Sequence, residues 1–183
     1  MPRHLVFSLM TLPLLLCCSA PGAGHLPVAE PMVETRELPR IDRDALQADE
    51  VIRLSRSGCA WACPSYQLSL FRDGTILFVG RSHTAIDGEQ RSQISDTAVA
   101  GLLRELQQQL PAMAMRYTPD SKNCGQMFTD QATSTLSARL QQGVVTSERY
   151  GGCPAAPKAL AELEKKVDVL AGSERLVSKS PTY

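Results

Sequence analysis

The sequence predicts an α+β domain in which an antiparallel sheet of about five strands carries two helices on one face. An Asp-Gly pair separates two stretches of alternating apolar residues, 66–71 and 75–79, which is a strong signal for a β-hairpin. Two later stretches, 96–110 and 157–172, repeat apolar residues at helical spacing, and each follows a hairpin-like unit. The predicted order is therefore β-β-β-α-β-β-α, and such helices pack on one face of the sheet.

The bulk composition excludes some classes of partner. The chain has 183 residues, with 19 Lys and Arg against 19 Asp and Glu. This length suits one domain after a leader is removed. The balanced charge gives no electrostatic reason to bind nucleic acid, so none is expected as a partner. We expect membrane contact only through a lipid anchor.

Residues 1–18 are predicted to be a signal peptide. The apolar run at 5–16 is too short to span a bilayer. It ends in Leu-Leu-Leu-Cys-Cys-Ser, which resembles the lipobox of bacterial lipoproteins and implies lipidation at Cys18. Lipidation at Cys17, ordinary cleavage at or beyond Ala20 and an uncleaved anchor remain alternatives.

Residues 19–45 are predicted to be a tether. They contain four prolines and several charges, and no apolar period emerges. A tether behind a lipidated cysteine would hold a domain, predicted at 46–172, away from a membrane face. The tail at 173–183 carries no interpretable pattern.

The first half of the domain is predicted to form three strands. Residues 51–55 alternate and form the first strand. A two-residue turn at Asp73-Gly74 would pair Arg72 with Thr75. That register divides the apolar side chains of the hairpin between two faces: Tyr66, Leu68, Leu70, Leu77 and Val79 on one, and Phe71, Ile76 and Phe78 on the other. The polar stretch at 80–93 is a loop or a weak edge strand.

The two helices have clear start and stop signals. Ser95 is a good N-cap for the first, which Pro111 ends. Pro157 is expected at the first position of the second, which Gly172 ends. Between the helices, residues 118–131 are irregular. Strands are expected at 132–140 and 144–150.

Four cysteines remain in the predicted domain, and an even number behind a secretory leader indicates two disulfides. Cys59 and Cys63 can bond only if their segment coils through about one helical turn, because a strand would separate their Cα atoms by roughly 13 Å. Cys124 and Cys153 flank the second hairpin, so pairing within each couple is the economical choice. The two crossed pairings remain open.

The Cys-x-x-x-Cys-Pro spacing also resembles the copper site of thioredoxin-like copper chaperones. That family has a helix after the motif and a distant histidine, whereas a strand is predicted here and the domain offers only His83. Redox-active pairs are usually Cys-x-x-Cys at a helix N-terminus, which also differs. We therefore expect no metal, cofactor or catalytic residue. Five aspartates of the domain sit at turn-like or capping positions, where carboxylates serve the backbone: Asp73, Asp87, Asp96, Asp120 and Asp130.

Trp61, the only tryptophan, lies between Cys59 and Cys63. It has two interpretations. It could pack over the disulfide and cap the core, or it could be an exposed anchor for a partner.

The stretch from 51 to about 169 resembles a bacterial family classed only as a domain of unknown function. Its members share a strand, Cys-x-Gly-x-Cys-Pro-x-Tyr, a second strand, Asp-Gly, and a strand ending in glycine. Trp61 stands where the family usually has glycine. The resemblance implies an envelope location and no particular reaction. The matching residues are Cys59, Cys63, Pro64, Tyr66, Asp73, Gly74, Gly80, Thr129, Asp130, Pro157, Leu160 and Leu163.

These observations leave the molecular function open and favour one hypothesis. The chain is expected to be a non-enzymatic, disulfide-stabilised domain of the bacterial envelope. It would be lipid-anchored facing the periplasm or secreted into it, and would act through contacts with another envelope protein or the cell wall. The alternative is a thiol redox or copper-handling protein that uses Cys59 and Cys63.

Overall fold

The computed structural model describes residues 45–177. The predicted signal peptide with Cys18, the tether up to residue 44 and the last six residues lie outside the described residues. The described part is a seven-stranded sheet in the order β4-β3-β2-β1-β6-β7-β5. The strands are β1 (Glu50–Arg56), β2 (Ser65–Phe71), β3 (Thr75–Ser82), β4 (Gly88–Gln93), β5 (Arg116–Tyr117), β6 (Thr133–Leu140) and β7 (Gly143–Tyr150).

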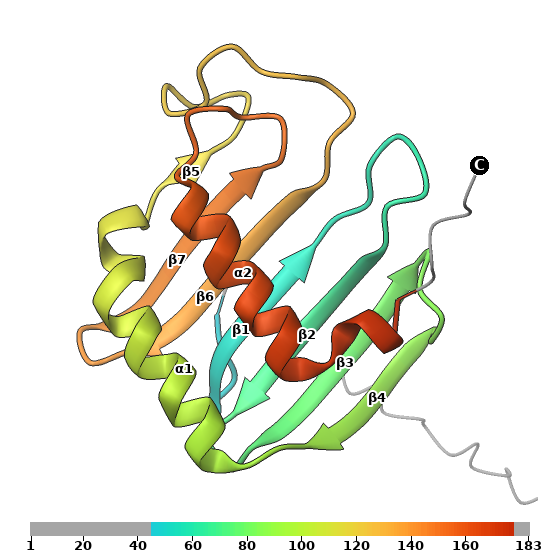
Figure 1. Ribbon diagram of the computed structural model, residues 1–183, viewed down its shortest axis with the longest axis vertical. Coiled ribbons are helices and arrows are strands. Elements are labelled where there is room, and N and C mark those ends of the chain that lie inside the picture. The colour runs from blue at the N-terminus through green and yellow to red at the C-terminus, as the bar shows by residue number, and fades with distance from the viewer. Residues whose placement is uncertain (1–44, 178–183) are drawn as a thin grey trace, which may run out of the picture. The chain divides into compact units, whose positions relative to one another are not determined.

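Two α-helices, α1 (Asp96–Gln109) and α2 (Lys158–Ala171), lie on the same face of the sheet, as Figure 1 shows. The cap predicted at Ser95 is present, because its Oγ accepts the Ala98 N–H at 3.2 Å. Gly172 ends α2 in the left-handed conformation, at φ 64°. Pro157 is the N-cap of α2 rather than its first helical residue, because its backbone is extended. Two short 3₁₀ helices follow the α-helices, η1 (Leu110–Met113) and η2 (Ser173–Arg175).

The strand count and order differ from the prediction because two strands lack an apolar pattern. β4 is an edge strand whose six residues are all exposed, so apolar side chains there would not be buried and no apolar pattern is needed. β5 has only two residues and pairs with β7 in parallel. The sheet is therefore antiparallel except at this one edge.

The first hairpin has a different register from the predicted one. Leu70 pairs with Ile76, and Leu68 with Phe78. The turn uses three residues, with the Gly74 N–H donating to the Phe71 carbonyl at 3.0 Å and Gly74 at φ 87°. A three-residue hairpin with glycine in the left-handed region shifts the register by one, and such a shift exchanges the faces of one strand.

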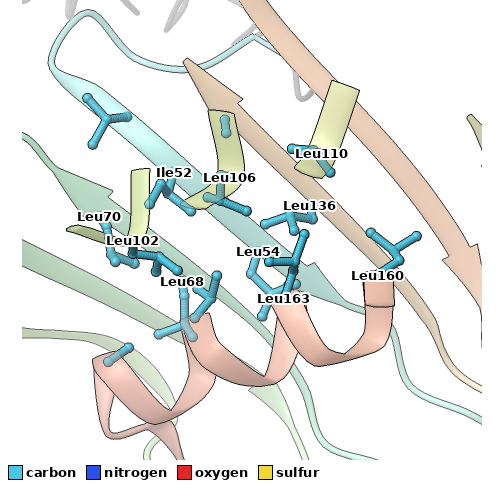
Figure 2. Close-up of a cluster of buried hydrophobic side chains, with 14 of the residues drawn as sticks. Ile52, Leu54, Leu68, Leu70, Leu102, Leu106, Leu110, Leu136, Leu160 and Leu163 are labelled. Carbon is cyan, nitrogen blue, oxygen red and sulfur yellow. The ribbon is translucent and has the colours of Figure 1, made fainter. Parts of the chain in front are cut away.

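The observed register changes which apolar side chains of the hairpin share a face. Ile76 and Phe78 join Tyr66, Leu68 and Leu70 on the face that the helices cover, while Leu77 and Val79 point to the other. Figure 2 shows the resulting core, in which leucines of α1 and α2 meet those of the central strands. Its largest fully buried members include Leu54, Leu68, Leu106, Leu136, Leu160 and Leu163.

Candidate functional site

The loop from Ser57 to Pro64, between β1 and β2, is the Trp61 loop. A disulfide joins Cys59 to Cys63, and their Cα atoms are 5.4 Å apart. Both cysteines are half-buried. The Trp61 side chain is 79% exposed, so it does not cap the core. A short covalent ring therefore presents a large apolar side chain to solvent.

The stem of the Trp61 loop is held by helix α2. Arg56 and Tyr66 are cross-strand partners at the ends of β1 and β2. The Tyr66 hydroxyl donates to Asp168 Oδ1 at 2.6 Å, and Arg56 Nη2 donates to Asp168 Oδ2 at 2.6 Å. One carboxylate thus fixes both strands from which the loop leaves the sheet.

A second carboxylate on α2 extends this arrangement. Glu164 lies one helical turn before Asp168, with its side chain 1% exposed. Arg149 of β7 binds it through two bonds of 2.9 and 2.5 Å, and Arg56 Nη1 lies 3.4 Å from it. We call the set the α2 clamp; its members are Arg56, Tyr66, Arg149, Glu164, Asp168 and Ser173, whose hydroxyl donates to Asp168 at 2.8 Å.

The α2 clamp has the chemistry of a structural network. Two arginines face two carboxylates, so its charges balance. Burial raises the pKa of Tyr66 well above its ordinary value, and the negative Asp168 beside it raises that pKa further. Tyr66 is therefore a neutral donor at physiological pH. Both oxygens of Asp168 already accept bonds from the protein.

The second disulfide, Cys124–Cys153, lies in a different environment. Its cysteines are 2% and 5% exposed and belong to the hydrophobic core, with Cα atoms 4.5 Å apart. It ties the irregular segment before β6, called the 118–132 loop, to the turn before α2. The Phe128 N–H donates to the Gly152 carbonyl at 2.8 Å, yet the Phe128 side chain is 68% exposed.

The Trp61 loop and the 118–132 loop leave the sheet side by side. β1 ends where its neighbour β6 begins, and Figure 1 shows both loops at the same end of the sheet. The Ser57 N–H donates to the Thr133 carbonyl at 2.8 Å, and the Thr133 N–H donates to Ser57 Oγ at 2.9 Å. One end of the sheet therefore carries Trp61 together with Met127 and Phe128, which are both exposed.

The residues considered for chemistry are not gathered into a reactive site. Asp73 accepts the Thr75 N–H at 2.9 Å, and this bond lowers the pKa of its carboxyl. Asp120 pairs with Arg116 on the surface. His83 follows β3 with a left-handed backbone, at φ 53°. In the part of the chain that the structure describes, no group of three or more His, Cys, Asp or Glu side chains is placed to hold a metal ion.

Two pockets of the described residues are not lined by Trp61, Met127 or Phe128. One of about 760 Å³ lies by the first hairpin turn and is lined by Phe71, Arg72 and Arg91 among others. Another of about 450 Å³ borders the α2 clamp at Tyr66 and Asp168. Trp61 lines neither of these two pockets, and its side chain is 79% exposed, so it offers an exposed apolar contact.

Sequence reasoning did not identify the α2 clamp. Its available signal was two acidic residues, Glu164 and Asp168, one turn apart and adjacent to the apolar stripe of a helix. Their partners Arg56, Tyr66 and Arg149 come from three strands. Only the sheet register and the helix placement bring these residues together.

Most residues that carry the family resemblance have structural roles here. Cys59 and Cys63 close the ring, Tyr66 belongs to the α2 clamp, and Gly74 permits the turn. Gly80 is required by close approach, because a Cβ there would lie 1.9 Å from the Ile86 carbonyl oxygen. None of these residues points to a reaction.

The two disulfides indicate a protein that folds outside the reducing cytoplasm. Within residues 45–177, no helix has the length and apolar character needed to cross a membrane. No curated protein matches the sequence. A family model described as domain of unknown function, DUF6438, matches residues 50–171, which span β1 to the end of α2. The chain therefore belongs to the DUF6438 family.

Proposed function

We propose that this chain is a non-enzymatic binding domain of the bacterial envelope, which contacts another envelope protein through Trp61. In this proposal the chain is exported by the signal at 1–18, lipidated at Cys18 and held off the membrane by the tether at 19–45. A periplasmic protein without the lipid is the alternative location.

The observation that carries the proposal is the exposure of Trp61 on a fixed loop. Burying an exposed tryptophan in a partner removes a large apolar area from water, and tryptophan is enriched among residues that dominate binding energy. The disulfide and the α2 clamp restrict the loop before binding, which lowers the entropy lost on association. Phe128, which is 68% exposed on the neighbouring loop, could extend the same contact.

The test is site-specific photo-crosslinking in the native envelope. A photoreactive phenylalanine analogue replaces Trp61 in one strain and Val144 in a control strain. Val144 is 45% exposed beside the β6–β7 turn, at the opposite end of the sheet. We expect a discrete protein adduct from position 61 and none from 144. Identical adducts from both positions would contradict a specific contact through Trp61. Trp61-dependent retention on isolated cell wall with no protein adduct would contradict a protein partner.

A thiol redox or copper-handling role for Cys59 and Cys63 has less physical support. Strand β2 follows the ring, so no helix N-terminus stabilises a thiolate at either cysteine. Measuring the reduction potential of this pair distinguishes the two functions. A value below about −300 mV fits a structural ring, whereas one in the oxidoreductase range would favour redox work.

A further inference from the structure

Strand β4 has the features of a self-complementary pairing edge. It is the first strand of the sheet, and among the described residues it pairs only with β3. All six of its residues are exposed, and Figure 1 shows it at the border of the sheet. An exposed edge of this length can add a further strand through its unpaired backbone groups.

The hydrogen-bond pattern shows which residues face outward. The Ile94 N–H donates to the Gly74 carbonyl at 3.0 Å, so Ile94 directs its backbone groups toward β3. Since these groups alternate along an antiparallel strand, Gln90 and Ser92 also face β3, while Glu89 and Arg91 direct theirs outward.

The charges on this edge select one register for two copies. When Gln90 lies opposite Gln90 of a second copy, each Glu89 faces an Arg91, and these are the outward-bonding residues. If the pairing were centred on residue 91 or on residue 89 instead, Arg91 would lie opposite Arg91 or Glu89 opposite Glu89. Like charges directly opposite one another are unfavourable. Within the described residues neither Glu89 nor Arg91 has an ion-pair partner, so both are available.

We propose that two copies of this chain associate through antiparallel β4–β4 pairing centred on Gln90. The interface is isologous, with two Glu89–Arg91 pairs related by a two-fold axis. Charges on an edge strand commonly oppose pairing. Here their order, acid and base two residues apart, makes the edge complementary to itself.

The first test is cysteine trapping at the two-fold axis. In the proposed register the two Gln90 residues form a non-hydrogen-bonded pair, with Cα atoms about 4.5 Å apart and therefore within reach of a disulfide. We expect the purified full chain carrying Gln90→Cys to form a covalent dimer under mild oxidation. The matched control is Ser92→Cys on the same side of the same strand, which should stay mostly monomeric because residue 92 faces residue 88. Equal cross-linking of both variants would overturn the register.

The second test is charge exchange, followed by sedimentation equilibrium. Glu89→Arg and Arg91→Glu should each weaken dimerisation by about tenfold or more, because each places like charges opposite one another twice. The double exchange should restore the wild-type affinity. A wild-type chain that stays monomeric at a concentration of about 1 mM, a dissociation constant that marks weak association, would overturn the proposal. A monomer that instead takes up a foreign extended peptide at β4 would also overturn it.

Discussion

The two disulfides lie at the same end of the sheet, yet they act on different parts of the molecule. Cys59 and Cys63 are four positions apart and half-buried, and Trp61 between them is exposed to solvent. Cys124–Cys153 spans 29 residues and is buried in the core. The first sets the shape of a surface loop, whereas the second connects a segment without regular structure to the body of the domain. A cysteine pair is thus informative about function only together with its burial and the length of its ring.

The largest expected effect is the loss of the buried disulfide. The variant Cys124→Ala/Cys153→Ala should lose about 3–4 kcal/mol of unfolding free energy in the loop-entropy model, because a long ring is opened. Cys59→Ala/Cys63→Ala is the matched control and should lose about 2 kcal/mol, since its ring is short. Urea denaturation followed by circular dichroism measures both. Equal losses, or a larger loss for the surface pair, would contradict the division of roles.

The sequence predicted those parts of the fold that depend on local chemistry. Ser95 caps its helix, Gly172 ends the other, and the apolar stripes of both helices are buried, because neighbouring residues determine each of these features. The hairpin was placed correctly, but its register was wrong by one residue. Asp73-Gly74 allows both a two-residue and a three-residue turn, and burial of Ile76 and Phe78 with the helices selects the latter.

The candidate site could be predicted only in part. The ring at Cys59 was visible from spacing, but the exposure of Trp61 was not, because an apolar side chain in a loop can pack or protrude. The α2 clamp combines residues more than 100 positions apart, such as Arg56 and Asp168. Nothing local to either residue indicates the contact.

The next largest effect should come from the α2 clamp, which connects the Trp61 loop to the body of the domain. Asp168→Ala should cost about 2–3 kcal/mol, because it leaves Arg56 with only its weaker contact to Glu164 and removes the acceptor of Tyr66. Since Trp61 is the only tryptophan, its fluorescence anisotropy reports on the loop and should fall in this variant.

Glu162→Ala provides the control for Asp168→Ala, since Glu162 is exposed on the same helix. It should change the unfolding free energy by less than about 0.5 kcal/mol and leave the anisotropy unchanged. An Asp168→Ala variant with wild-type anisotropy would show that the ring alone holds Trp61 in place. The clamp would then serve stability only.

The smallest expected effect comes from removing only the hydroxyl of Tyr66 and leaving the rest of the α2 clamp intact. Tyr66→Phe should cost about 1 kcal/mol at neutral pH, because one hydrogen bond to Asp168 is lost while Arg56 and Ser173 still bind that carboxylate. The folded protein raises the pKa of Tyr66 above the value of about 10 that tyrosine has in an unfolded chain. Below pH of about 10 both states keep the proton, so the contribution of the hydroxyl is fully present.

Above that pH the unfolded chain releases the proton first, and the wild-type protein loses stability at up to about 1.4 kcal/mol per pH unit from this group. The variant lacks that loss, so the difference in unfolding free energy between the two proteins should shrink as the pH rises from 9 to 11. Urea denaturation across this range measures the difference, and the remaining tyrosines titrate equally in both proteins. Parallel pH profiles would mean that Tyr66 ionises as easily in the folded protein as in the unfolded chain. The stem of the Trp61 loop would then be open to solvent. In that case only the Cys59–Cys63 ring, and not the α2 clamp, would hold the loop in place.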